Sequence, residues 1–151
     1  MTRRAGFAWY ETLMVLAAIG SITALAVPMT KDAGRQAIAI HVLADVDSVR
    51  TAVYRFYSDS GYFPAQAGFT KVPEGLSAYL PRGFSFRRPY GTLDYKNWTL
   101  ATPFTETMSS NVIGISVVAA DPQVGAAAMA LYGDNPKLVV GSQRVFLIFG
   151  A

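Results

Sequence analysis

A long apolar stretch near the N-terminus constrains this chain more than any other feature. Residues 7–27 contain a single charged side chain, Glu11, and are otherwise dominated by Leu, Val, Ile and Ala. A helix needs about 20 such residues to cross the apolar core of a bilayer, so this stretch is long enough to span a membrane. Arg3 and Arg4 come just before it. By the positive-inside rule, the N-terminus is expected to stay in the cytoplasm while the rest of the chain is exported.

Three interpretations fit a stretch of this kind. One is a secretory signal peptide, because Ala24, Leu25 and Ala26 form an A-x-A cleavage site after the apolar run. The second is a plain membrane anchor. Neither explains Glu11, because a carboxylate at membrane depth costs roughly 3 kcal/mol on insertion scales. The third interpretation gives that carboxylate a role.

The residues around Glu11 resemble the N-terminus of type IV prepilins and type II secretion pseudopilins. Gly6 and Phe7 follow a short basic leader, Glu11 is the fifth residue counted from Phe7, and Pro28 follows an Ala-Val pair at the end of the apolar run. These features match the family's cleavage and methylation motif. The resemblance is specific over about the first 28 residues and faint beyond them.

The resemblance implies a role for each of these residues. A prepilin peptidase would cut the chain between Gly6 and Phe7, and the new N-terminal amine of Phe7 would be methylated. The free amine has a pKa near 8, so it is cationic at neutral pH. Glu11 would then pair with the Phe7 amine of a neighbouring subunit during assembly, and Pro28 is implied as a second assembly position.

The resemblance also implies an organisation and a location. The expected segments are a leader (1–6), a transmembrane and assembly helix (7–29), an amphipathic continuation (30–57) and a periplasmic globular α+β head (58–151). The chain would wait in a bacterial inner membrane and then enter a periplasmic pseudopilus or a cell-surface filament. Its implied partners are other pilin or pseudopilin subunits, the peptidase and an inner-membrane assembly platform.

Helical spacing of apolar residues continues beyond the membrane segment. Those that recur every three or four positions are Ile38, Val42, Val46, Val49, Val53 and Phe56. Such a stripe lies on one helix face, and packing on the chain's own sheet explains it better than a partner-binding groove. We therefore predict one helix from Phe7 to about Tyr57. Pro28 and Gly34 interrupt it, and because proline lacks an amide hydrogen, a kink or melted turn is expected at Pro28.

The rest of the chain turns to strands and short helices. Strands are predicted over residues 93–100, 111–118, 138–140 and 143–149, with short helices over 74–80 and from Asp121–Pro122 to Gly133. The expected fold is therefore α+β and pilin-like. A long N-terminal helix, membrane-spanning in its first half, packs on a small antiparallel sheet.

The residues that could carry chemistry are few. The chain has 151 residues and no cysteine, which leaves no room for a large multidomain enzyme and excludes disulfides, Cys-ligated metals and thiol nucleophiles. His41 is the only histidine and has no obvious carboxylate partner. The aspartates that fall in or near predicted loops are Asp59, Asp94, Asp121 and Asp134. They could in principle ligate calcium, but turn and capping roles fit them better. We predict no enzyme, no cofactor and no metal.

A basic and aromatic segment raises one further possibility. Residues 82–90 combine Arg82, Arg87 and Arg88 with three aromatic side chains, a composition that can bind single-stranded nucleic acid by charge and stacking. A solvated loop beside a strand is the simpler interpretation. The alternative function is thus a minor pilin that binds DNA or a surface in uptake or adhesion, although a nucleic-acid partner is not expected.

The function implied by the resemblance is that of a structural subunit, processed by a prepilin peptidase and polymerised from the inner membrane. Two kinds of filament stay open, the type II secretion pseudopilus and the type IV pilus. The absence of cysteine disfavours the disulfide-looped major pilins. The residues from Gly61 to Pro64 are slightly more similar to the corresponding segment of pseudopilins. A secreted enzyme released by signal peptidase has no catalytic constellation to support it.

The cleavage motif predicts where the mature chain begins. Intact-mass measurement and N-terminal peptide mapping should find a methylated Phe7 as the first residue, and replacing Gly6 with a bulky residue should leave the precursor uncut in the membrane. A mature chain that starts at Val27 would instead establish the signal peptide and refute the prepilin interpretation.

Overall fold

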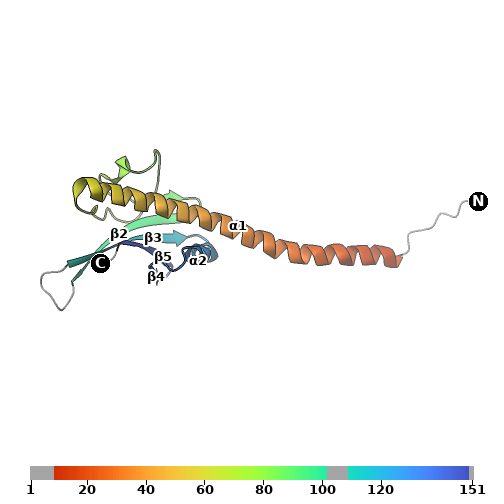
Figure 1. Ribbon diagram of the computed structural model, residues 1–151. Coiled ribbons are helices and arrows are strands. Elements are labelled where there is room, and N and C mark those ends of the chain that lie inside the picture. Colours follow the sequence, from red (N-terminus) through yellow and green to blue (C-terminus); the bar gives the residue numbers. More distant parts are fainter. Residues whose placement is uncertain (1–8, 102–108, 150–151) are drawn as a thin grey trace, which may run out of the picture. The chain divides into compact units, whose positions relative to one another are not determined.

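The computed structural model describes residues 9–101 and 109–149 (Figure 1). Its elements are α1 (Trp9–Ser60), the 3-10 helix η1 (Leu76–Ala78), β1 (Arg87–Arg88), β2 (Gly91–Ala101), β3 (Ser109–Ala119), α2 (Pro122–Leu131), β4 (Lys137–Val140) and β5 (Gln143–Phe149). The chain divides into two compact units, Met1–Arg35 and Gln36–Ala151. We call them the N-terminal unit and the head unit and describe each by itself.

The N-terminal unit consists of the first part of α1. An 18-residue window of this helix has a mean hydropathy of 2.0 and none of it is buried, so by length and composition it could cross a membrane. The melted turn predicted at Pro28 is not found, because α1 is continuous past both Pro28 and Gly34. Proline has no amide hydrogen and so removes one backbone hydrogen bond from the helix. The hydrogen-bonded turns on either side keep the backbone helical. Nearby, the Thr30 hydroxyl donates to the Val27 carbonyl at 2.9 Å.

In the head unit, α1 buries one stripe of side chains. Its buried residues are Ala39, Val42, Val46, Val49, Ala52, Val53 and Phe56. The predicted stripe is therefore confirmed except at Ile38, which is 40% exposed and gives way to Ala39. The helix ends at Ser60, slightly beyond the predicted Tyr57, and the Gly61 amide donates to the Tyr57 carbonyl at 2.8 Å with Gly61 at φ 77°. A left-handed glycine at this position is a common helix terminator.

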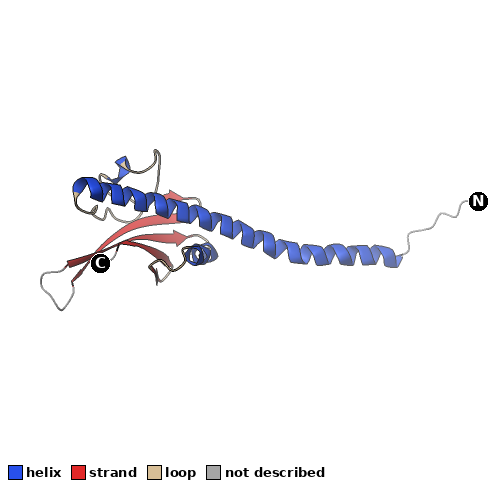
Figure 2. Cartoon of the chain, viewed as in Figure 1, coloured by secondary structure: helices blue, strands red, loops and turns tan. Residues whose placement is uncertain are grey.

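The sheet is antiparallel throughout, with strand order β1-β2-β3-β5-β4. Tyr95 on β2 lies opposite Ile115 on β3, which is in turn paired with Phe146 on β5. All three side chains are buried in the core that α1 covers. Figure 2 shows the strands lying beneath the second half of this helix. The expected α+β arrangement, a long helix packed on a small antiparallel sheet, is confirmed.

The second helix covers the same face of the sheet. The Asp121 side chain accepts a hydrogen bond from the Gln123 amide at 2.9 Å, and Pro122 opens α2, as the sequence predicted. Val124, Ala128 and Met129 join the same hydrophobic core as α1. The core is therefore bounded by two helices on one side and by the sheet on the other.

Three boundaries differ from the predictions. The strand β1 was not predicted, because two residues are too few to show alternation. The helix predicted over 74–80 is a single 3-10 turn, η1. The strands β2 and β3 are each 11 residues long, longer than predicted, because they pair with each other along their whole length.

Gly91 opens β2 at a place that admits no side chain. It has φ 148°, and a Cβ there would lie 2.1 Å from the Val118 carbonyl oxygen. Gly91→Ala should therefore lower the free energy of unfolding by roughly 2 kcal/mol or more. Gly34→Ala is the control, since it meets no atom within 4 Å and lies inside a helix. Urea unfolding of the full chain in detergent compares the two, and equal stabilities would contradict the expectation.

Candidate functional site

The predicted processing and assembly residues lie at the start of the chain. Gly6 and Phe7 lie outside the described residues. Glu11 lies near the first described residue of α1, with an exposed side chain. Pro28 lies within the same helix, in the stretch that is long and apolar enough to cross a membrane.

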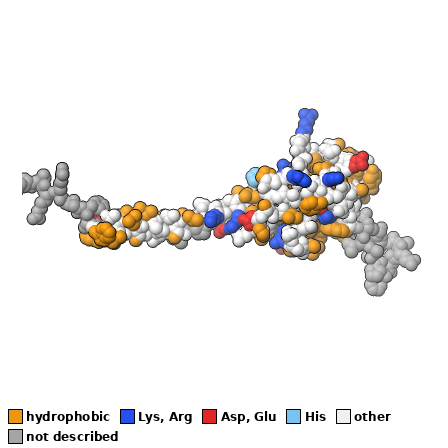
Figure 3. Space-filling view, turned by 180° about the vertical axis from the view of Figure 1, so that it is seen from behind, with side chains coloured by type: hydrophobic (Ala, Val, Ile, Leu, Met, Phe, Trp, Pro, Cys, Tyr) orange, Lys and Arg blue, Asp and Glu red, His pale blue; other side chains and the backbone are white. Residues whose placement is uncertain are grey.

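Large apolar side chains surround this part of α1. Those exposed between 46% and 80% are Trp9, Tyr10, Leu13, Met14, Val15, Leu16, Ile19, Ile22, Val27 and Met29. Figure 3 shows apolar side chains along this part of the helix. Soluble monomers rarely expose a continuous apolar surface of this size, and a helix that is apolar on all sides belongs in a membrane or in the core of an assembly.

In the head unit, Asp45 binds two polar side chains from a distant segment. Its two carboxylate oxygens accept hydrogen bonds from the Arg88 guanidinium and the Tyr90 hydroxyl, each at 2.7 Å. The Arg88 side chain also lies over the Phe84 ring, 4.3 Å from its centre. Both partners in the ion pair are mostly buried, with 26% of Arg88 and 19% of Asp45 exposed. This cluster fastens the segment before β2 to the middle of α1.

The structure separates the three arginines that the sequence grouped together. Arg88 is bound to Asp45, whereas Arg82 and Arg87 are exposed. The aromatic side chains between them are not free to stack on bases, because Phe86 is buried and Phe84 packs against Arg88. The segment therefore acts mainly as a structural clamp, and it leaves two arginines at the surface.

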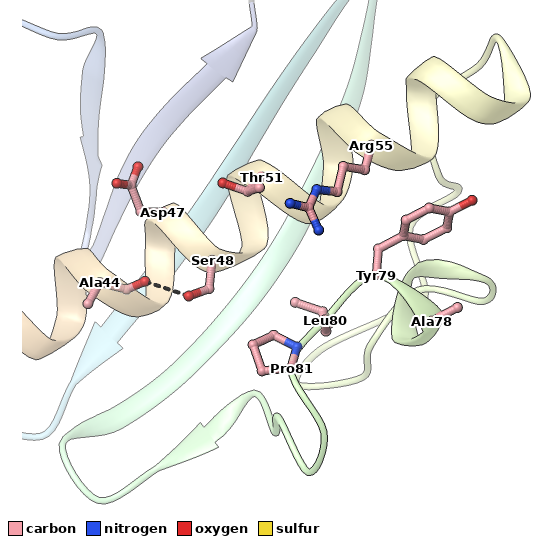
Figure 4. A pocket seen from close by; sticks show the side chains of 9 residues that line it. All are labelled: Ala44, Asp47, Ser48, Thr51, Arg55, Ala78, Tyr79, Leu80 and Pro81. Carbon is pink, nitrogen blue, oxygen red and sulfur yellow. Dashed lines mark hydrogen bonds between the residues drawn. The ribbon is translucent and has the colours of Figure 1, made fainter.

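Two hollows border α1 in the head unit. One, of about 440 Å³, is lined by His41 and by the cluster of Asp45, Arg88 and Tyr90. The other, of about 690 Å³, lies between α1 and residues 78–81 (Figure 4). Arg55 extends along the larger hollow.

Neither hollow has the marks of a catalytic site. His41 is exposed, and the hydroxyl of Ser48 in the larger hollow donates to the Ala44 carbonyl of its own helix at 2.8 Å. No histidine lines that hollow among the described residues. The arrangement therefore offers no nucleophile and base in contact.

The four loop aspartates are not gathered into one site. Asp59 accepts a hydrogen bond from the Tyr79 hydroxyl at 2.8 Å, Asp94 pairs with Lys96 at 2.5 Å, and Asp121 caps α2. Asp134 is exposed in the turn before β4. Within the described part of the chain, no three His, Cys, Asp or Glu side chains lie close enough to hold a metal ion.

One comparison with known proteins found a similar architecture. No family model matches the chain, and no curated protein matches it. Among solved structures, the chain is similar to the major type IV pilin PilA1 from Clostridium difficile, with 15% sequence identity and a TM-score of 0.51. The alignment covers 76% of this chain and 96% of that pilin. The chain therefore has a pilin-like fold.

Sequence reasoning missed the cluster around Asp45. Its partners Arg88 and Tyr90 are 43 and 45 positions away, so no local spacing connects them. The sequence analysis singled out residues 82–90 for their positive charge. It did not predict that Arg88 binds Asp45 of α1. A lone aspartate flanking an apolar stripe was the only local signal.

The cluster predicts how stability depends on pH. Burial, followed by the hydrogen bond to Asp45, raises the pKa of Tyr90 above its ordinary value of about 10. Burial raises the pKa of Tyr95 in the same direction. Above pH 10 the unfolded chain loses these phenol protons while the folded chain keeps them. The contribution of these two phenols to stability should therefore be constant below about pH 10 and fall as the pH rises beyond it.

Urea unfolding between pH 8 and 11 tests this dependence, with Tyr90→Phe expected to make the decline shallower. Tyr62, which is 62% exposed, provides the control substitution Tyr62→Phe. A Tyr90→Phe variant with the same decline as the original chain would rule out the expected contribution of Tyr90.

Proposed function

We propose that the chain is the structural subunit of a pilin-like filament. The observation that carries the proposal is the combination of a pilin-like fold with a long helix, α1, whose most apolar 18-residue window is not buried by any described residue. Membrane helices associate through close packing and polar contacts, because lipid provides no hydrophobic drive between them. A filament of many copies gives this helix a second apolar environment once it leaves the bilayer.

In this proposal, Glu11 sets the register of assembly. A prepilin peptidase cuts after Gly6, and the new amine of Phe7 is methylated and keeps its positive charge. The Glu11 carboxylate of one subunit pairs with the Phe7 amine of the next. A charge that is costly in the membrane is thereby paired when two copies are correctly aligned.

The proposed organisation follows from this mechanism. Residues 1–6 are the leader, 7–29 cross the inner membrane, 30–57 continue the helix, and 58–151 form the periplasmic head. The N-terminus faces the cytoplasm before cleavage. The peptidase and an inner-membrane assembly platform are the proposed partners besides other subunits.

Two kinds of filament fit the proposal. The absence of cysteine and the Gly61 to Pro64 segment favour a type II secretion pseudopilus over a disulfide-looped major pilus. Neighbouring genes decide between them, since a secretin and a secretion ATPase accompany a pseudopilus, whereas a twitching ATPase accompanies a type IV pilus.

Replacing Glu11 separates an assembly subunit from an anchored protein. Glu11→Ala should leave membrane insertion intact, or improve it, and should leave cleavage after Gly6 unaffected. It should abolish incorporation into sheared filaments when it is the only copy present, because the Phe7 amine loses its partner. Thr12→Ala is the neighbouring control and should assemble normally.

Filament yield, processing and membrane content are measured together in cells that carry each variant. Normal assembly of Glu11→Ala would show that Glu11 is not an assembly register. An uncleaved original chain, or one that never forms filaments in its own host, would refute the proposed function itself.

A further inference from the structure

The charges on the first part of α1 are separated by the thickness of a bilayer core. Residues 12–30 carry no charge, and Glu11 and Lys31 flank them. These two residues are 20 positions apart in one continuous helix, which at 1.5 Å per residue separates them by about 30 Å. The apolar core of a bilayer is also about 30 Å thick. Both charges can therefore lie at the two boundaries of the core at the same time.

The side chains next to Glu11 are of the kind that favours such a boundary. Trp9 and Tyr10 are 80% and 63% exposed. Each has a large apolar ring with one polar group, and both residue types are enriched where the acyl chains of a bilayer meet its headgroups. At the other end of the uncharged stretch, Asp32 pairs with Arg35 at 3.2 Å. Each end of the stretch thus has residues suited to the headgroup region.

Three hydroxyl side chains within the stretch are satisfied by the helix itself. Ser21, Thr23 and Thr30 donate to carbonyls of α1 at 2.8, 2.8 and 2.9 Å. Lipid offers no acceptor to a hydroxyl, so a polar group in the core must find its partner within the protein. These three side chains can therefore face lipid without losing a hydrogen bond.

We propose that residues 12–30 cross the bilayer core, and that Trp9 and Tyr10 contact lipid headgroups at the N-terminal boundary with Glu11 beside them. The inference rests on the proposed function, which supplies the membrane, and it refines the span of 7–29. Before assembly the Glu11 carboxylate then contacts water and headgroups, where a charge costs less than at the centre of the core. Its cost arises when the helix moves out of the bilayer, and pairing with a second subunit offsets it at that step.

Tryptophan fluorescence in lipid vesicles tests the position of Trp9. The chain has two tryptophans, so Trp98→Phe leaves Trp9 as the only one. The full chain is reconstituted in vesicles of phosphatidylcholine and phosphatidylglycerol at a low protein-to-lipid ratio. A nitroxide near the headgroups should quench Trp9 at least about twofold more than a nitroxide near the bilayer centre.

The control moves the reporter to the middle of the span. It combines Ile22→Trp with Trp9→Phe and Trp98→Phe, so that the change in the head unit is common to both proteins. Ile22 lies about 20 Å further along the helix than Trp9. The nitroxide near the bilayer centre should quench this reporter more strongly than the one near the headgroups.

Thiol labelling locates the two ends of the span, because the chain has no cysteine of its own. Thr12 and Thr30 each lie about 14 Å along the helix from Ser21. Thr12→Cys, Thr30→Cys and Ser21→Cys each replace a hydroxyl with a thiol. With a water-soluble maleimide on both sides of the vesicle, the two end variants should react at similar rates, and Ser21→Cys at least about tenfold more slowly.

The same measurements can overturn the inference. Stronger quenching of Trp9 by the deep nitroxide, or slow labelling of Thr12→Cys beside fast labelling of Thr30→Cys, would place Glu11 inside the core. Quenching of Trp9 by neither nitroxide would mean that lipid does not contact it, as when another subunit covers it. Fast labelling of Ser21→Cys would show that the stretch does not cross the core.

The failure of this inference is distinct from the failure of the proposed function. The vesicles contain no assembly machinery, so quenching and labelling report the depth of the helix whether or not filaments form. A chain that forms no filaments in its own host would count against the proposed function and leave the depth measurement as it stands.

Discussion

The head unit depends on the packing of one stripe of α1 against one face of the sheet. Tyr95, Ile115 and Phe146 supply three neighbouring strands with large buried side chains on that face. The residues of α1 that face the sheet are smaller. Among them, Ala39 and Ala52 are fully buried. Burying apolar area at about 25 cal/mol per Å² is the main favourable term in such a core. The connections and the second helix are arranged around this contact.

The same helix has a different requirement N-terminal to Lys31. There the apolar side chains do not form a stripe but surround the helix, and none of the most apolar window is buried. A helix of this kind is stable only where something other than water covers it. The chain therefore joins a region that completes its own core to one that, by length and composition, could cross a membrane. Glu11 is the one charged residue among residues 7–27.

The sequence predicted those features that depend on local spacing. The stripe on α1, the cap at Asp121 and the four longer strands were all found, because periodicity and capping are properties of neighbouring residues. Ile38 and Ala39 show the limit of this approach, since they lie four and three positions before Val42 and helical spacing alone does not choose between them. The strand β1 and the partner of Asp45 were missed, because both are defined by contacts between distant segments. Gly6 and Phe7 carry the strongest sequence motif, and its meaning rests on a resemblance and not on geometry.

The arginine-rich segment shows why composition alone misjudges a surface. Three arginines in one short stretch suggested a basic patch, but Asp45 binds Arg88 and Tyr90 and thereby fixes the segment to α1. Ion pairs between exposed helix neighbours, such as Asp47 and Arg50 at 3.9 Å, contribute only a few tenths of a kcal/mol. The partly buried pair between Asp45 and Arg88 restrains two distant segments and so has a larger structural effect. The charges available for recognition are those that such pairs leave over.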